Sequence, residues 1–430
     1  MTCKSLSMLL LITLVSLAIL PSALAQDNEQ KLRNFNNSHG YWGTSPSSAL
    51  VLDSAGNLYG TTATGGPNHS LCNGNGCGTA FELVPGPNGK WSEKLLHSFN
   101  GRDGMEPMAN LIFDAAGDLY GTTFAGGDLT CRDGGGKGCG TVFELIPGAN
   151  GKWAEKVLHR FGGKDGFTPT ASLIFDTKGN LYGTTLGGGT YGGGTVFELT
   201  PNGSGQWTGS LLYSFSSGNG GFNPYAGVIL DTQGNLYGTA TSGGAYDLGT
   251  VFELTPGSNG QWTETLLYSF GSSRKDGSVP YGGLIFDTAG NLYGTGFDGG
   301  THGYGAVFEM TPGTNGQWTE TLLYSFGSIR NDGWLPMGNL VFDASGNLYG
   351  STYAGGVQRS ACDTYGCGTV FELSPGANGT WTEQILHRFG KGKDGANPQS
   401  GPILDSSGNL YGTTPLGGAY GYGTAFKITP

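Results

Sequence analysis

The chain repeats one arrangement of apolar runs and alternating segments, and a unit near its middle shows it most clearly. Residues 281–287 form a short apolar run, which predicts an inner strand buried on both faces. From Trp318 to Phe326 apolar and polar residues alternate, which predicts a half-exposed outer strand. Residues 291–295 and 306–310 read as two further strands between Gly-rich turns. The unit therefore predicts four antiparallel strands and no helix.

The phrase GNLYGTT, or a near copy, occurs in every unit and fixes their number. Its tyrosine recurs at intervals of 55 to 62 residues, at Tyr59, Tyr120, Tyr182, Tyr237, Tyr293, Tyr349 and Tyr411. A period of this length is typical of solenoids and propellers. Seven units of four strands predict an all-β, seven-bladed β-propeller.

The two ends of the chain complement each other. The seventh unit stops at Pro430 without the outer strand that the other units carry. Residues 31–35, Lys-Leu-Arg-Asn-Phe, resemble the outer-strand phrase Leu-Leu-His-Ser-Phe at 95–99. We predict that 31–35 form the outer strand of blade 7, which would close the ring and remove an open sheet edge.

The first 25 residues have the features of a secretory signal peptide. Lys4 supplies a positive charge, residues 9–20 are apolar, and Ala23 to Ala25 offer a small-residue cleavage site. We expect residues 1–25 to be removed and 26–430 to form one secreted, extracellular propeller domain. No second apolar stretch of spanning length follows, so membrane insertion is not expected.

Composition narrows the class of partner. Without Lys4, the chain has 20 cationic and 32 acidic side chains, a net charge of −12. An acidic surface disfavours nucleic acid and anionic membranes as partners. The 83 glycines would suggest disorder without a period, but here they mark the turns of the repeat.

The paired phrases DxxGNLYGTT and GTVFEL resemble a known family. They are similar to the tandem repeat called GloVer, found in exported bacterial proteins of the "choice-of-anchor" type. The resemblance covers nearly all of residues 48–430. It implies a secreted propeller and brings no catalytic residues with it. No surface anchor is recognisable in this chain.

Six cysteines remain after the signal peptide, and they form three local pairs. All lie in the loop before the third strand, and only in the three units where that loop is enlarged. An even count in an exported chain predicts disulfides, whereas a shared zinc ion would require pairs from distant units to meet. The predicted pairs are Cys72 with Cys77, Cys131 with Cys139, and Cys362 with Cys367.

The loop from each outer strand to the next inner strand carries the phrase DGxxP in five units. Its aspartates are Asp103, Asp165, Asp276, Asp332 and Asp394, and Gly220 and Trp42 take this position in the other two units. A ring of carboxylates on the channel rim could hold Ca²⁺, which prefers oxygen ligands. The alternative is that the Asp-Gly pair only shapes the turn.

Other repeated polar and aromatic positions are predicted to be structural. The aspartate that ends each inner strand should cap its turn, and the glutamate of the FEL phrase should bond a neighbouring strand. The tryptophans that open the outer strands should pack. His97, His159 and His387 stand where other units have tyrosine, which indicates strand residues rather than one metal set.

Residues that differ between units mark the candidate ligand site. Directly after the loop proline, at the channel end of the inner strand, stand Ser47, Met108, Thr170, Tyr225, Tyr281, Met337 and Gln399. Exposed rings of the adjoining loops could stack on sugar faces, unless they merely pack the loops. The ligand-binding candidates are Trp42, Trp334, Tyr225, Tyr281, Tyr353, Tyr422 and Gln399. We expect the site over the arc of blades six, seven, one and two, where the irregularities gather.

These features favour a monomeric binding module for an extracellular glycan or a protein surface. The alternatives are a polysaccharide-acting hydrolase or lyase and a structural cell-surface repeat protein. The chain contains no GxSxG, HExxH or phosphate-loop motif, so no catalytic residue is predicted and an enzyme is not favoured. No cofactor is expected beyond the calcium candidate.

Overall fold

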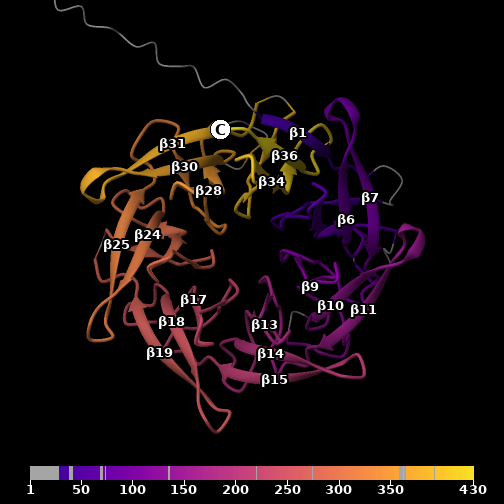
Figure 1. Ribbon diagram of the computed structural model, residues 1–430, viewed down its shortest axis with the longest axis horizontal. Helices are drawn as coiled ribbons and strands as arrows, with labels where there is room; N and C mark the ends of the chain where they lie inside the picture. Colours follow the sequence, from indigo (N-terminus) through magenta and orange to yellow (C-terminus); the bar gives the residue numbers. More distant parts are fainter. Residues whose placement is uncertain are drawn as a thin grey trace, which may run out of the picture.

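The computed structural model describes residues 29–37, 42–67, 71–72, 74–133, 136–218, 220–273, 275–357, 362, 365–391 and 393–430. Seven four-stranded antiparallel sheets stand around a central opening, as the prediction of a seven-bladed propeller requires (Figure 1). The described residues contain no α-helix and only three single-turn 3₁₀ segments, Pro87–Gly89, Ala149–Gly151 and Ala377–Gly379. The predicted signal peptide lies outside the described residues.

Each blade runs from a short inner strand at the channel to an outer strand at the periphery. Blades 1 to 3 consist of β3 (Val51–Leu52), β4 (Leu58–Thr62), β6 (Thr79–Pro85) and β7 (Trp91–Ser98); β8 (Ile112–Phe113), β9 (Leu119–Thr123), β10 (Thr141–Pro147) and β11 (Trp153–Arg160); and β12 (Ile174–Phe175), β13 (Leu181–Thr185), β14 (Thr195–Asn202) and β15 (Gln206–Ser214). Blades 4 to 6 consist of β16 (Ile229–Leu230), β17 (Leu236–Ala240), β18 (Thr250–Pro256) and β19 (Trp262–Ser269); β21 (Ile285–Phe286), β22 (Leu292–Gly296), β24 (Ala306–Pro312) and β25 (Trp318–Ser325); and β27 (Val341–Phe342), β28 (Leu348–Thr352), β30 (Thr369–Pro375) and β31 (Trp381–Arg388). Blade 7 consists of β33 (Ile403–Leu404), β34 (Leu410–Thr414), β36 (Thr424–Ile428) and β1 (Glu29–Asn34).

The N-terminal strand closes the ring, as the sequence predicted. β1 pairs antiparallel with β36, from Glu29 opposite Ile428 to Asn34 opposite Thr424. The strand starts two residues before the predicted 31–35 and ends one residue earlier. The backbone N–H of Phe35 continues the pairing by donating to the Gly423 carbonyl at 3.0 Å. Blade 7 is therefore assembled from both ends of the chain.

The inner strands are shorter than the sequence predicted. Of residues 281–287, only Ile285 and Phe286 pair within their own sheet. The backbone before them bonds the neighbouring blades instead: the Gly283 N–H donates to Asn339 Oδ1 at 2.7 Å, and the Gly282 carbonyl accepts from Thr239 Oγ1 at 3.2 Å. Inner segments thus serve as joints between blades.

The first hydroxyl of each GTT phrase makes such a joint in all seven blades. It donates to a backbone carbonyl of the next blade's inner segment, at 2.7 to 3.3 Å. The donors are Thr61, Thr122, Thr184, Thr239, Thr295, Ser351 and Thr413. We call these seven bonds the hydroxyl belt. Because each bond is buried or partly buried, it satisfies a carbonyl that water reaches poorly.

Phenylalanines form the core between blades. At each junction the phenylalanine after an outer strand meets the phenylalanine of the next blade's third strand, with ring centroids 5.0 to 5.2 Å apart. Phe35 and Phe81 make this contact at the closure, where both rings are fully buried. The closure is therefore packed like the other six junctions.

Two glycines explain the fixed letters of the repeat phrase. In the DTAGN turn, Gly290 has a φ of +90°, which L side chains rarely adopt. The Asp287 carboxylate closes that turn by accepting the backbone N–H of Ala289 and Asn291 at 2.8 and 2.9 Å, so the predicted turn cap is confirmed. A Cβ on Gly294 would lie 2.6 Å from the Phe308 ring. The first glycine of the phrase is therefore required by a tight turn, and the second by a close contact with a phenylalanine ring.

The loop rim carries the remaining regular structure. Four two-stranded sheets stand there: β2 (Gly43–Thr44) with β5 (Thr64–Gly65), β20 (Gly277–Ser278) with β23 (Asp298–Gly299), β26 (Gly333–Trp334) with β29 (Ala354–Gly355), and β32 (Gly395–Ala396) with β35 (Leu416–Gly417). The three predicted disulfides are formed in the enlarged loops of blades 1, 2 and 6.

Candidate functional site

The central channel contains the cavity that best fits a small ligand. It has a volume of about 500 Å³ and is lined by the inner segments of all seven blades. The seven variable residues that follow the loop prolines all lie on its wall, one from each blade: Ser47, Met108, Thr170, Tyr225, Tyr281, Met337 and Gln399. The sequence thus identified the positions that surround the channel.

Aromatic rings occupy the wall on blades 4 and 5. Tyr225 and Tyr281 meet edge to face with centroids 4.9 Å apart, and Phe297 supports Tyr281 at 5.0 Å. Burial raises the pKa of Tyr225, and the neighbouring Tyr281 adds to the shift, so the phenol stays neutral at physiological pH. Both tyrosines are half-buried, which leaves ring surface toward the cavity.

Amides and hydroxyls occupy the wall on the opposite blades. Gln399 is half-buried, and its amide makes no hydrogen bond with the described part of the protein. The Ser400 hydroxyl beside it is buried and lacks a hydrogen-bond partner among the described residues. No Asp, Glu, His, Lys or Arg stands among the described residues that line the cavity. The channel therefore offers rings and neutral polar groups to a ligand.

The rim candidates lie on blades 6, 7 and 1. Trp334 stacks on Tyr304 at 4.4 Å and borders a rim cavity of about 460 Å³ with Asp332 and Arg330. Trp42 instead lies beneath the Arg33 guanidinium, 5.5 Å from its carbon, at the closure.

The two remaining rim candidates lie near these segments, because the Tyr353 N–H donates to the Leu335 carbonyl beside Trp334 and the Tyr422 carbonyl accepts the Ser45 N–H, each at 3.0 Å. Tyr422 is 41% exposed on blade 7, and Tyr353 is half-buried on blade 6. That these rings bind a ligand together stays a prediction.

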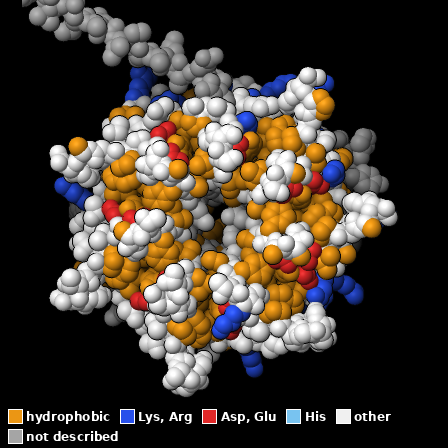
Figure 2. Space-filling view, viewed as in Figure 1, with side chains coloured by type: hydrophobic (Ala, Val, Ile, Leu, Met, Phe, Trp, Pro, Cys, Tyr) orange, Lys and Arg blue, Asp and Glu red, His pale blue; other side chains and the backbone are white. Residues whose placement is uncertain are grey.

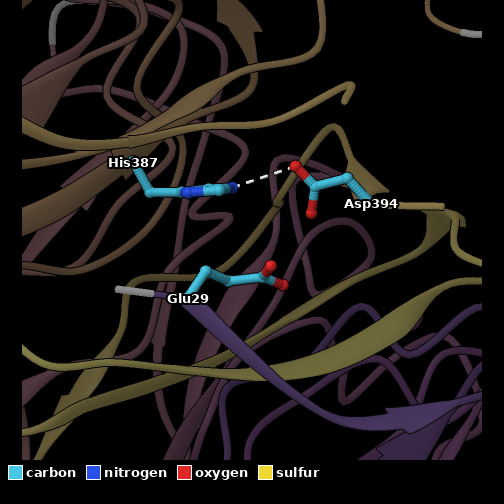
Figure 3. A group of neighbouring side chains, drawn as sticks. All are labelled: Glu29, His387 and Asp394. Carbon is cyan, nitrogen blue, oxygen red and sulfur yellow. Dashed lines mark hydrogen bonds and ion pairs between the residues drawn. The ribbon is translucent and has the colours of Figure 1, made fainter. Parts of the chain in front are cut away.

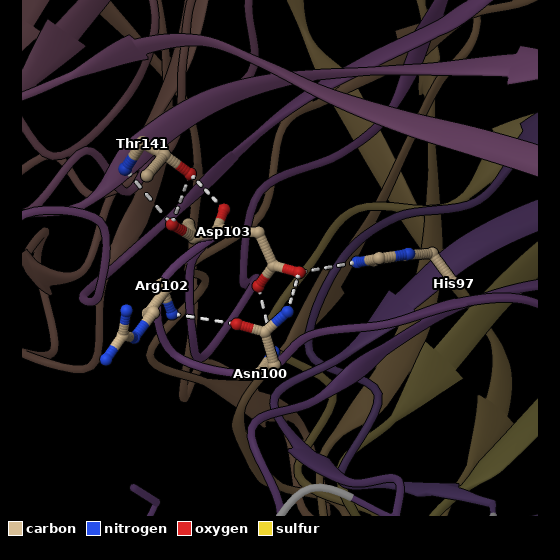
Figure 4. Close-up of polar contacts among 6 residues, drawn as sticks. His97, Asn100, Arg102, Asp103 and Thr141 are labelled. Atoms are coloured by element: carbon tan, nitrogen blue, oxygen red, sulfur yellow. Dashed lines mark hydrogen bonds and ion pairs between the residues drawn. The ribbon is translucent and has the colours of Figure 1, made fainter.

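The five DGxxP aspartates lie at junctions between blades, and none of them is among the described residues that line the channel cavity. Each accepts a bond from the outer strand of the preceding blade: Asp103 from His97, Asp165 from His159, Asp276 from Tyr268, Asp332 from Tyr324, and Asp394 from His387. Figure 4 shows Asp103 held by His97 and by Asn100. Each carboxylate is thus bonded within its own junction between blades, and calcium binding by these residues stays a prediction.

A third side chain completes most of these clusters, and sequence reasoning missed its role. It is the glutamate two residues after the tryptophan that opens the next outer strand, for example Glu383 after Trp381. The Tyr324 hydroxyl lies 3.1 Å from Asp332 and 3.0 Å from Glu383. The WxE phrase, present in five units, was the signal that could have revealed it. We call these groups the junction clusters.

Burial makes the junction glutamates unusual acids. Burial raises the pKa of Glu383 to about 8, and the nearby Asp332 carboxylate adds to the shift. Burial and Asp276 likewise raise the pKa of Glu320 to about 7. At the closure, burial raises the pKa of Glu93 to about 7 although Arg33 lies 2.6 Å away and opposes the shift.

The other predicted structural residues behave as expected. Glu82 of the FEL phrase bonds the Tyr59 hydroxyl and forms an ion pair with Lys94 of the adjoining outer strand at 3.1 Å. Trp153 packs near the Tyr59 ring of the preceding blade at 6.1 Å. His97, His159 and His387 lie on outer strands, as predicted.

Apolar grooves lie between blades near the DxxGN turns. The groove of blades 3 to 5 has a volume of about 1150 Å³ and is lined by Tyr182, Tyr237, Trp262, Phe286 and Trp318 together with turn residues. In Figure 2, apolar patches alternate with polar projections around the central opening. These grooves form a second surface that carries aromatic side chains, in addition to the channel wall.

Comparison with solved structures shows the fold and no more. An ancestral GH74 enzyme matches over 94% of this chain with a TM-score of 0.54 and 10% identity. A puromycin hydrolase matches over 86% with a TM-score of 0.52 and 12% identity. The extracellular domain of a one-component system from B. thetaiotaomicron matches over 90% with a TM-score of 0.51 and 15% identity. The match spans 51%, 50% and 40% of those chains.

A search of curated proteins found no match. The model of the Gloeobacter/Verrucomicrobia repeat matches residues 128–362, which is more than half of the chain. The repeated phrases, the propeller built from them and this match agree, and the chain belongs to the Gloeobacter/Verrucomicrobia repeat family.

Proposed function

We propose that this propeller is an exported binding module that holds a neutral carbohydrate at its central channel. The observation that carries the proposal is the channel cavity of about 500 Å³, whose described lining is neutral and combines Tyr225 and Tyr281 with Gln399. Tyrosine rings stack on the apolar faces of sugars, and amides and hydroxyls bond sugar hydroxyls. A pocket of this size suits one or two sugar rings.

The distribution of carboxylates favours binding over hydrolysis. A glycoside hydrolase places two carboxyl groups on either side of the scissile bond. Here no acidic side chain is among the described residues that line the channel, and Asp332 and Glu383, which share the Tyr324 hydroxyl, lie in a junction cluster. One of the similar structures is a GH74 enzyme, but that likeness extends to the fold alone.

Export is part of the proposal. Residues 1–25 have the pattern of a signal peptide, and three disulfides are stable where the surroundings are oxidising. Within the described ranges, no helix is long and apolar enough to cross a membrane. We propose that the chain acts outside the cytoplasm, as a monomer.

A glycan array tests the function and the place of binding together. We expect the exported protein to bind a set of neutral glycans, and the double variant Tyr281→Ala/Gln399→Ala to lose that binding at least tenfold. Trp334→Ala is the matched control, because it removes a rim ring and leaves the channel wall intact. Loss in Trp334→Ala alone would move the ligand to the rim. A folded protein that binds no glycan would refute the carbohydrate proposal and favour a protein partner.

A further inference from the structure

The junction clusters differ in one respect that points to a metal ion. Three outer strands supply tyrosine, and in one of these clusters the Tyr324 hydroxyl bridges Asp332 and Glu383. Where the outer strand supplies histidine, the imidazole Nε2 lies beside the aspartate, as in His97 with Asp103 and His387 with Asp394. The histidine clusters therefore bring an imidazole nitrogen next to carboxylate oxygens, a set of donors that a transition metal ion takes.

The cluster between blades 6 and 7 shows this most completely (Figure 3). His387 Nε2 lies 3.0 Å from Asp394 Oδ2, and both side chains are only 2% exposed. The Glu29 carboxylate points toward them from β1, and its side chain is 6% exposed. Its Oε2 pairs with Lys31 at 3.3 Å, whereas its Oε1 is buried and has no hydrogen-bond partner among the described residues. An unsatisfied buried carboxylate oxygen is costly unless a cation meets it.

The three donors have the spacing that one ion requires. One ligand atom from each of Glu29, His387 and Asp394 lies within 4.8 Å of the others. Donors of a tetrahedral zinc site stand about 2 Å from the ion and therefore roughly 3.3 Å from one another. The observed separation of 3.0 Å between His387 and Asp394 is already close to that value.

We propose that Glu29, His387 and Asp394 form a Zn²⁺ site that fastens the closing strand β1 to blade 6. One imidazole nitrogen with two carboxylates suits zinc, whereas calcium prefers oxygen ligands alone. A divalent cation also neutralises two carboxylates that would otherwise lie together in a dry junction. Because Glu29 belongs to the N-terminal strand, His387 to blade 6 and Asp394 to the loop between blades 6 and 7, the ion would hold the ring shut.

A second cluster repeats the arrangement between blades 1 and 2. His97, Asp103 and Glu155 also bring one donor each within 4.8 Å, and Glu155 Oε1 is buried without a partner. The third histidine cluster lacks the third donor, because Gly209 stands where the glutamate would be beside His159. The chain thus contains two candidate sites and one natural control.

The test is zinc binding by the exported protein that retains Glu29. After treatment with chelator and desalting, we expect calorimetric titration with ZnCl₂ to give two zinc ions per chain. His387→Tyr, which reproduces a tyrosine cluster, should leave one ion, and His387→Tyr combined with His97→Tyr should leave none. His159→Tyr is the matched control and should still bind two. Zinc should raise the melting temperature of the wild type by at least about 2 °C, and of His387→Tyr by less.

Circular dichroism checks that each variant folds, and Glu29→Gln provides a second route if His387→Tyr does not. Absence of zinc binding to the folded wild type would overturn the proposal. Undiminished binding in both His387→Tyr and Glu29→Gln would also overturn it, as would equal loss in His159→Tyr. Calcium chloride in the same titration should give no heat at these sites.

Discussion

The channel wall and the junction clusters take equivalent positions in every repeat, yet their chemistry is opposite. The wall changes from blade to blade, from Ser47 to Tyr281 to Gln399, and stays uncharged among its described residues. The clusters keep one pattern and gather buried acids such as Asp332 and Glu383. The comparison teaches that the repeat places its charged groups where blades meet and leaves the channel free to vary.

The largest expected effect comes from removing the strand that completes the seventh junction. A chain that begins at Phe35 lacks β1, so it exposes the edge of β36 and the core around Leu32. We expect its melting temperature to fall by more than about 10 °C, because edge pairing and apolar burial are lost together. Thermal unfolding followed by circular dichroism measures the change. A chain that begins at Glu29 is the control, and equal melting of the two would contradict the closure.

The disulfide loops should matter less, since each closes a short segment. Replacing Cys362 and Cys367 by serine should lower the free energy of unfolding by about 2 kcal/mol, from the greater entropy of the unfolded chain. Urea unfolding measures it. The variant should bind glycans like the wild type, because Cys362, Cys367 and the other described residues of that loop are not among those that line the channel. Loss of glycan binding would show that rim and channel act as one surface.

The pH dependence of stability separates the junction clusters from the channel. Glu383 has a pKa of about 8 in the folded chain against an ordinary value of 4.5, so the folded state keeps a proton that the unfolded state releases. Stability therefore falls as pH rises from 4.5 to 8. Glu383→Gln should remove this fall and raise the free energy of unfolding at pH 8 by on the order of 1–2 kcal/mol.

Urea unfolding of Glu383→Gln at pH 5 and pH 8 measures that difference. Glu264→Gln is the matched control, because Gly220 replaces the aspartate in its junction and only Tyr213 contacts the glutamate. We expect a smaller pH response there. A Glu383→Gln variant that still loses stability between these pH values would contradict the assignment.

The smallest effect on stability is expected in the channel. Gln399 is half-buried and its amide bonds nothing in the described protein, so Gln399→Ala should change the free energy of unfolding by less than about 0.5 kcal/mol. Its effect on glycan binding should be at least tenfold under the proposed function. A large loss of stability would instead assign Gln399 to the framework.

The fold could be predicted from the sequence because the same four-strand pattern occurs seven times. The GNLYGTT phrase gave the number of blades, and the resemblance of 31–35 to 95–99 gave the closure. The limits of the inner strands were wrong, because Gly282 and Gly283 bond neighbouring blades rather than their own sheet. Hydrogen bonds between neighbouring blades cannot be predicted from the sequence pattern of a single unit.

The candidate sites were only partly predictable for the same reason. The channel residues follow a proline in each unit, so their position could be predicted from spacing alone. The junction clusters join an outer strand, a loop and the next blade, as His387, Asp394 and Glu29 do across 358 or more residues of chain. Their third member was visible only as WxE, a phrase that also fits an ordinary alternating strand.

The pairing of β1 with β36 has a consequence for the order of the blades. Glu29 stands opposite Ile428, so the two ends of the described propeller lie side by side (Figure 1). The ring itself has no first blade, and a short linker could join the ends while a new start is opened in another interblade loop. Circular permutants of this kind should fold to the same ring. The gene order, and not the fold, would then decide which blade is assembled from both ends of the chain.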